Sequence, residues 1–213
     1  MSAASALHQW PAVILINGPS SAGKSTLARD LQSAVTHPYL VTGFDDFIFM
    51  SAPRYYLGAD TGSQSTVDEF TSQGVQMRRT SGVDEPPSVV ADFGPVVRRI
   101  LDAMAPAVRT LVDCGNDVIF DHVLHDQAHY ESLRVAFAGL DVLTVGVVCP
   151  LDVLAERERS RGDRVLGRAR GLADVVHTFV DYDVTVDTDA NNRTECVELV
   201  LGALNQPGQD SRS

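Results

Sequence analysis

The chain has 213 residues, of which 44% are hydrophobic and 21% charged, a composition that is ordinary for a globular protein and excludes a disordered one. Its formal net charge of -11 at pH 7 argues against a nucleic acid or an anionic membrane as partner, because both require a dominant basic surface. Three widely spaced cysteines show no zinc-binding spacing, and the first apolar run is too short for a signal peptide or a membrane span. We therefore expect one cytoplasmic α/β domain over residues 1–213, with reduced thiols.

Apolar strands alternate with amphipathic helices along the chain. Residues 12–17 form a continuous apolar run typical of a buried parallel strand, and residues 24–35 carry Leu27, Leu31 and Ala34 on one helical face. Further strands are predicted at 39–42, 117–120, 142–149 and 184–186, and further helices at 96–105, 127–137, 151–160 and 194–204. This order predicts a five-stranded parallel sheet with helices on both faces.

Two segments lie outside this alternation. Residues 51–92 are polar, rich in Gly, Ser and Thr, and show no strand pattern. A loop of that length inside one domain is usually functional, so we expect an insertion beside a binding site. Residues 205–213 have the composition of a disordered tail.

Residues 18–25 read GPSSAGKS and match the pattern GxxxxGK[ST] between a predicted strand and a predicted helix. Glycines let the backbone N–H groups of such a loop converge on an anion, and the helix N-terminus adds to the field. Lys24 is the only lysine beside sixteen arginines, as expected where a compact ammonium must reach the β- and γ-phosphates. We predict that ATP or GTP is held by Gly18, Ser20, Ser21, Ala22, Gly23, Lys24, Ser25 and Thr26.

Carboxylates follow two of the predicted strands. Asp45 stands in GFDD after the second strand, where it can accept the proton of an attacking hydroxyl, whereas Asp46 is expected to cap a helix or to face solvent. Asp121 ends the strand VIFD, and with Ser25 it is expected to hold Mg²⁺. His122 and His125 follow closely. They are read as hydrogen-bonded structural residues, with a substrate contact as the alternative.

Six of the sixteen arginines fall between residues 157 and 170. Arg157 and Arg159 alternate with glutamates and are expected to form pairs on a solvated helix face. Arg161 and Arg164 flank a Gly-Asp break and are expected to stabilise the charge on a transferring phosphoryl group. Arg168 is assigned to nucleotide binding together with Arg161. Residues 157–172 are therefore predicted to form an arginine-rich lid.

The combination of INGPSSAGKS, GFD, VIFD, RGDRVLGRA, VVH and YDVTVDT resembles the chloramphenicol phosphotransferase family over nearly the whole chain. The resemblance implies a P-loop NTPase fold of the adenylate-kinase type, with a five-stranded parallel sheet, a lid and an acceptor-binding insertion at 51–92. It implies transfer of the γ-phosphoryl group of a nucleoside triphosphate to an alcohol of an antibiotic, in self-resistance or resistance. The aspartate that acts as base in the family matches Asp45.

The sequence departs from the family pattern in two places. His122 stands where a second acid follows the strand in the family, and the 51–92 segment is longer and shares few residues. The antibiotic is therefore left open between a chloramphenicol-like compound and a nucleoside antibiotic such as capuramycin. The expected partner is a small molecule, and a homo-oligomer is left open.

Other nucleotide-binding classes fit less well. A signalling GTPase needs a lysine in its base-reading motif, and no second lysine exists, while a transport ATPase needs a signature that is absent. Two alternatives stay open. One is a small-metabolite or nucleotide kinase, whose anionic acceptor would meet arginines such as Arg54, Arg78 or Arg98. The other is a nucleotide-binding regulator without catalysis.

Overall fold

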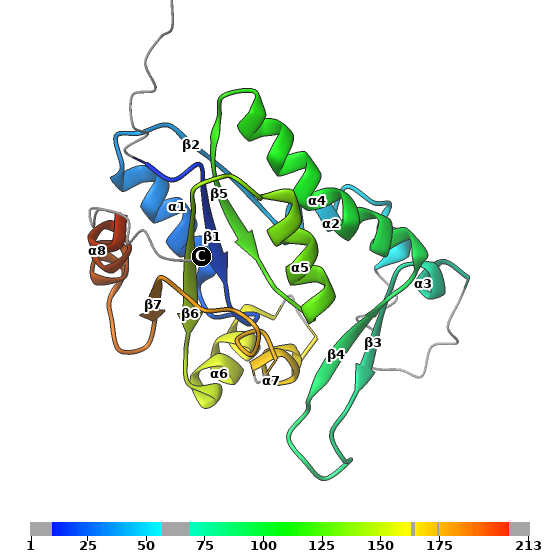
Figure 1. The fold of residues 1–213 in the computed structure, drawn as a ribbon. Helices are drawn as coiled ribbons and strands as arrows, with labels where there is room; N and C mark the ends of the chain where they lie inside the picture. The colour runs from blue at the N-terminus through cyan, green and yellow to red at the C-terminus, as the bar shows by residue number, and fades with distance from the viewer. Residues whose placement is uncertain (1–9, 57–68, 163–164, 174, 205–213) are drawn as a thin grey trace, which may run out of the picture.

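A five-stranded parallel sheet forms the centre of the computed structural model, which describes residues 10–56, 69–162, 165–173 and 175–204. The strand order is β2-β5-β1-β6-β7, and each neighbouring pair runs parallel (Figure 1). The strands are β1 (Val13–Asn17), β2 (Tyr39–Gly43), β5 (Asp117–His122), β6 (Val142–Val148) and β7 (Val184–Asp187). The predicted fold class is confirmed, and every strand ends at the same edge of the sheet.

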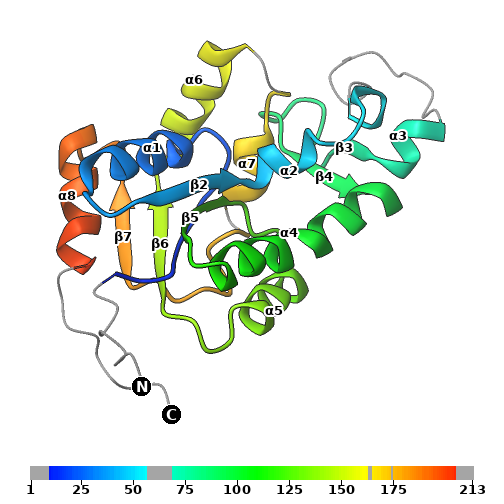
Figure 2. The ribbon, with the colours of Figure 1, turned by 90° about the horizontal axis from the view of Figure 1, so that it is seen from above.

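Helices cover both faces of the sheet because its central strands are apolar on both sides. Val13 and Leu15 of β1 pack in one core with α4 (Pro95–Asp113) and α5 (Gln127–Ala136). Ile14 and Ile16 pack in the other core with α1 (Lys24–Ala34) and α8 (Arg193–Leu204). Figure 2 shows α1 and α8 on one side of the sheet and α4 and α5 on the other. In the described part of the chain, no helix is long and apolar enough to cross a membrane.

The segment predicted to lack strands contains a hairpin. Strands β3 (Val75–Arg79) and β4 (Val89–Phe93) pair antiparallel, so that prediction was wrong. Only Val75 and Val89 are buried, and the rest of the hairpin is partly or fully exposed. A strand pair that is buried at so few positions has no continuous apolar run for the sequence to show. The helix α3 (Glu69–Gln73) and the short turn η1 (Pro53–Tyr55) precede the hairpin, and residues 57–68 lie outside the description.

Three more helices surround the carboxyl edge of the sheet. They are α2 (Phe44–Ile48), α6 (Leu151–Arg161) and α7 (Arg168–Ala173). The helix predicted to end at residue 105 instead continues to Asp113 through Pro106. The predicted tail at 205–213 lies outside the described residues.

Candidate active site

The loop between β1 and α1 is a tight turn at the carboxyl edge of the sheet. Ser21 and Gly23 adopt left-handed backbone angles, with φ of 64° and 96°. A Cβ atom at Gly18 would lie 2.4 Å from the Val147 carbonyl oxygen, so only glycine lets the loop approach β6 this closely. Lys24 is buried, and its Nζ donates to the Pro19 carbonyl oxygen at 3.0 Å across the loop.

The loop has the polar groups that a nucleotide phosphate would need. The buried hydroxyl oxygens of Ser20 and Ser21 have no hydrogen-bond partner among the described residues. Buried polar groups are almost always paired, so these hydroxyls fit a loop whose partner is an anion. The pocket beside them is lined by Ser20, Ser21, Gly23, Lys24, Ser25, Thr26, Phe44, Asp45, Asp121, Val123, Arg161, Arg168 and Leu172.

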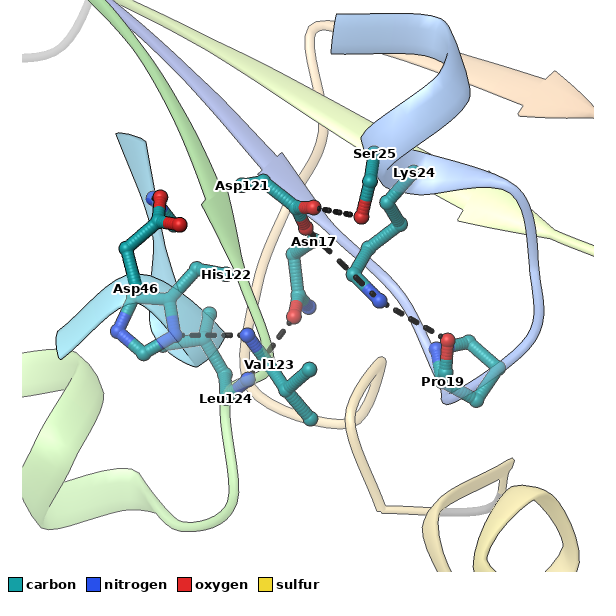
Figure 3. Close-up of polar contacts among 10 residues, drawn as sticks. Asn17, Pro19, Lys24, Ser25, Asp46, Asp121, His122, Val123 and Leu124 are labelled. Carbon is teal, nitrogen blue, oxygen red and sulfur yellow. Dashed lines mark hydrogen bonds and ion pairs between the residues drawn. The ribbon is translucent and has the colours of Figure 1, made fainter. Parts of the chain in front are cut away.

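Ser25 and Asp121 meet at the start of α1. The Ser25 hydroxyl donates to a carboxylate oxygen of Asp121 at 2.5 Å, and the Lys24 ammonium lies 4.0 Å from the other oxygen. Figure 3 shows these three side chains pointing toward one another. Burial raises the pKa of Asp121, while Lys24 and the Ser25 hydrogen bond oppose that shift. A hydroxyl and a carboxylate beside a phosphate loop fit Mg²⁺, which prefers oxygen ligands.

The adjacent acids Asp45 and Asp46 have different surroundings. Asp46 accepts the backbone N–H of Gly43 at 2.8 Å and caps the start of α2, as predicted. Asp45 lies one residue earlier and lines the pocket that also contains Lys24. The structure therefore places Asp45, and not Asp46, at the predicted site.

The arginines of the predicted lid have different surroundings. Arg161, which ends α6, and Arg168, which begins α7, both line the pocket. Arg159 pairs with Glu156 on the exposed face of α6, as predicted. Arg164 lies outside the described residues.

The prediction of a solvated glutamate pair for Arg157 was wrong. Its guanidinium donates to the hydroxyl and the carbonyl oxygen of Thr188, each at 2.9 Å. The Thr188 hydroxyl in turn donates to the Ala22 carbonyl oxygen at 2.8 Å. Arg157 thus ties the end of β7 to the phosphate loop, a contact between three segments that no helix periodicity reveals.

Asn17 is a second residue that sequence reasoning missed. Its side-chain amide donates to the Val176 carbonyl oxygen at 2.6 Å and to the Tyr182 hydroxyl at 2.7 Å. Its Oδ1 accepts the backbone N–H of Leu124 at 3.0 Å. One fully buried amide therefore joins the phosphate loop, the segment after β5 and the segment after α7. The one signal was its position, a polar residue at the end of an apolar strand directly before the loop.

A histidine pair lies behind Asp121. The backbone N–H of Val123 donates to His122 Nδ1 at 2.7 Å, so His122 carries its proton on Nε2. That nitrogen donates to His129 Nε2 at 2.9 Å, which makes His129 the acceptor. Burial lowers the pKa of both rings, and His122 is the hydrogen-bonded structural residue that the sequence predicted.

His125 packs against the rings of Phe44 and Phe93, and its Nε2 is buried with no partner among the described residues. Burial is the largest cause that lowers its pKa to about 3. The hydrogen bond predicted for His125 is therefore not found at Nε2. Over the described part of the chain, no group of three or more His, Cys, Asp or Glu residues could hold a metal ion.

We expect the native state to lose stability as the pH falls from 7 to 5. A neutral buried His125 stabilises the fold fully above pH 6.5, the ordinary histidine pKa, and less as the pH falls toward the folded pKa of about 3. The loss from this ring is about 2 kcal/mol at pH 5, since one pKa unit corresponds to about 1.4 kcal/mol. Urea unfolding at both pH values measures the change. The His125→Phe variant keeps an aromatic ring in place and should show a shallower pH dependence; an unchanged dependence would contradict the prediction.

The sequence matches the family of chloramphenicol phosphotransferase-like proteins over residues 11–205. The chain belongs to this family. A Mycobacterium tuberculosis (strain H37Rv) protein with the provisional name O-phosphotransferase is 30% identical over 189 residues, which cover 84% of this chain and 75% of that protein. A cytidylate kinase of Acidiphilium cryptum (strain JF-5) is 35% identical over 100 residues, which cover 43% of this chain and 46% of the kinase.

The fold is that of the P-loop kinases. An unliganded sugar kinase from Janibacter sp. HTCC2649 superposes with a TM-score of 0.60 at 15% identity, covering 91% of this chain and 94% of the kinase. At that identity the likeness shows the fold alone. The activity follows from the family and its O-phosphotransferase relative, which make this chain a phosphotransferase with a hydroxyl acceptor.

Proposed function

We propose that this family member transfers the γ-phosphoryl group of ATP or GTP to a hydroxyl of an antibiotic. The observation that carries the proposal is the meeting of Lys24, Asp45 and Arg161 around one pocket at the carboxyl edge of the sheet. Ligands of open α/β sheets bind at this edge. A base, a cation for the phosphates and an arginine are the groups that phosphoryl transfer to an alcohol requires.

The nucleotide would lie on the phosphate loop, with Lys24 against its β- and γ-phosphates and the orphaned Ser20 and Ser21 hydroxyls toward phosphate oxygens. Ser25 and Asp121 would hold Mg²⁺, which supplies charge neutralisation at the phosphates when bound. The Asp45 carboxylate accepts the proton of the acceptor hydroxyl. Arg161 and Arg168 line the same pocket and stabilise the charge that grows on the transferring group.

The acceptor would approach from the side of Asp45, where Phe44, Val123 and Leu172 line the pocket and the β3–β4 hairpin stands beyond α7. The family name supports an antibiotic as acceptor, and the long 51–92 segment supports recognition that differs from the rest of the family. We place sugar- or nucleoside-containing antibiotics ahead of chloramphenicol. We further propose that the enzyme makes its host resistant to the antibiotic. It would act in the cytoplasm, where nucleoside triphosphates are available.

The experiment is a panel of antibiotics incubated with the enzyme and Mg-ATP or Mg-GTP, read by mass for a phosphate adduct. We expect one compound of the panel to gain a phosphate and the Lys24→Ala variant to form none, because it lacks the only lysine at the loop. Expression in a sensitive host should raise resistance to that compound, and the Lys24→Ala variant should not. A panel in which no antibiotic is modified would overturn the antibiotic assignment.

A nucleotide or small-metabolite kinase is the second candidate, and the partial match to a cytidylate kinase favours it. Cytidine monophosphate and other nucleoside monophosphates therefore belong in the same panel. Efficient turnover of one of them, with no antibiotic modified, would put this function in place of the first. Binding of ATP with no transfer to any acceptor or to water would instead favour a nucleotide-binding regulator.

A further inference from the structure

Glu158 is a carboxylate in the interior of the molecule. It lies on the inner face of α6 and is 2% exposed. Its Oε2 accepts the backbone N–H of Gly167 at 2.6 Å, and its Oε1 accepts that of Ala169 at 3.0 Å. Burying a carboxylate destabilises a fold unless the group is hydrogen-bonded, and here each of its two oxygens accepts a backbone N–H.

The two bonds enclose Arg168. Gly167 and Ala169 are the residues on either side of it, so Glu158 holds the backbone N–H of the residue before this arginine and that of the residue after it. Arg168 begins α7 and lines the pocket with Lys24 and Asp45. The direction in which its side chain leaves the backbone is therefore set from α6.

The opposite side of α7 rests on strand β4. The Val89 N–H donates to the Gly167 carbonyl oxygen at 3.0 Å. A Cβ atom at Gly171 would lie 2.1 Å from the Val89 carbonyl oxygen, and one at Gly167 would lie 2.6 Å from that of Pro87. Gly171 therefore lets the backbone of α7 touch that of β4, and Gly167, directly before the helix, lets the chain pass close to the residues before the strand. Figures 1 and 2 both show α7 beside the hairpin.

We propose that Glu158 is a positioning residue for phosphoryl transfer, which holds Arg168 in the pocket, and that the Gly171 contact ties this arginine to the β3–β4 hairpin. The inference rests on the proposed role of Arg168 at the transferring phosphoryl group. It also links the hairpin, on the acceptor side, to the helix that begins with this arginine.

Glu158→Gln is the sharpest single change. The side chain keeps its size, but its amide nitrogen is a donor and cannot accept either backbone N–H, so one of the two bonds is lost. Glu156→Gln is the matched control, because this residue lies on the exposed face of the same helix and pairs with Arg159. Gly171→Ala disturbs Arg168 from the hairpin side without touching Glu158.

The test is a double-mutant cycle on phosphate release from Mg-ATP with water as acceptor, so it needs no antibiotic. We expect Glu158→Gln and Gly171→Ala each to lower kcat about tenfold or more, with nucleotide KM changed less than about threefold. In an Arg168→Ala background, each should lower kcat by less than about twofold, since a positioning residue has nothing left to position. Glu156→Gln should leave kcat unchanged.

The inference would be overturned if Glu158→Gln and Gly171→Ala lowered kcat by the same factor in the Arg168→Ala background as in the unchanged enzyme. An unchanged kcat in Glu158→Gln would also overturn it. If Glu158→Gln fails to fold by circular dichroism, the Gly171→Ala cycle decides in the same way. An Arg168→Ala variant with full kcat would show instead that the proposed role of Arg168 is wrong. A panel without any modified antibiotic leaves this cycle intact, so the two failures are distinguishable.

Discussion

Replacing Arg161 by alanine should lower kcat by about 10³- to 10⁵-fold, the range found for arginines that act on a transferring phosphoryl group. Arg161 ends α6 and lines the pocket with Lys24 and Asp45. Negative charge on the γ-phosphoryl oxygens is redistributed in the transition state, so a guanidinium there lowers the barrier more than it tightens binding of the nucleotide.

Steady-state kinetics with Mg-ATP and the acceptor that the panel identifies, together with a nucleotide binding titration, separate the two effects. Arg159→Ala is the control, because Arg159 is two residues earlier on α6 and pairs with Glu156 on the exposed surface. It should change kcat by less than about twofold, as exposed ion pairs contribute little. An effect of Arg161→Ala confined to KM would mean that this arginine only holds the ground-state nucleotide.

Asp45→Asn should lower kcat by about 10²- to 10⁴-fold, which is the usual contribution of a general base. The amide has nearly the same size as the carboxylate but cannot take the proton of the acceptor hydroxyl. Nucleotide binding should be retained, because the phosphate loop and the Ser25–Asp121 pair are untouched.

Asp46→Asn is the matched control, since the two residues are adjacent in α2. Asp46 accepts the Gly43 N–H as a cap, so its replacement should cost stability of about 1 kcal/mol and little turnover. Measuring kcat and the thermal unfolding of both variants decides which of the two carboxylates is the general base. If Asp46→Asn lost turnover and Asp45→Asn kept it, the base would be Asp46.

Sequence alone was enough for the sheet and the phosphate loop. Both depend on local patterns: unbroken apolar strands between helices, and the run from Gly18 to Ser25 between a strand and a helix. The carboxyl ends of parallel strands meet at one edge, so Asp45 and Asp121 were expected near the loop. The structure places Asp45, Ser25 and Asp121 around the same pocket.

Only the tertiary structure identified the partners of residues that act through other residues. Arg157 reaches Thr188, His122 donates to His129, and Glu158 holds the backbone around Arg168. In sequence these appear as a helix-face charge, a histidine after a strand and one glutamate of an alternating Glu–Arg run. The hairpin at Val75–Arg79 and Val89–Phe93 was likewise missed. For the three side chains the reason is that the partner lies on another segment, and for the hairpin it is that too few positions are buried. In both situations no local periodicity carries the information.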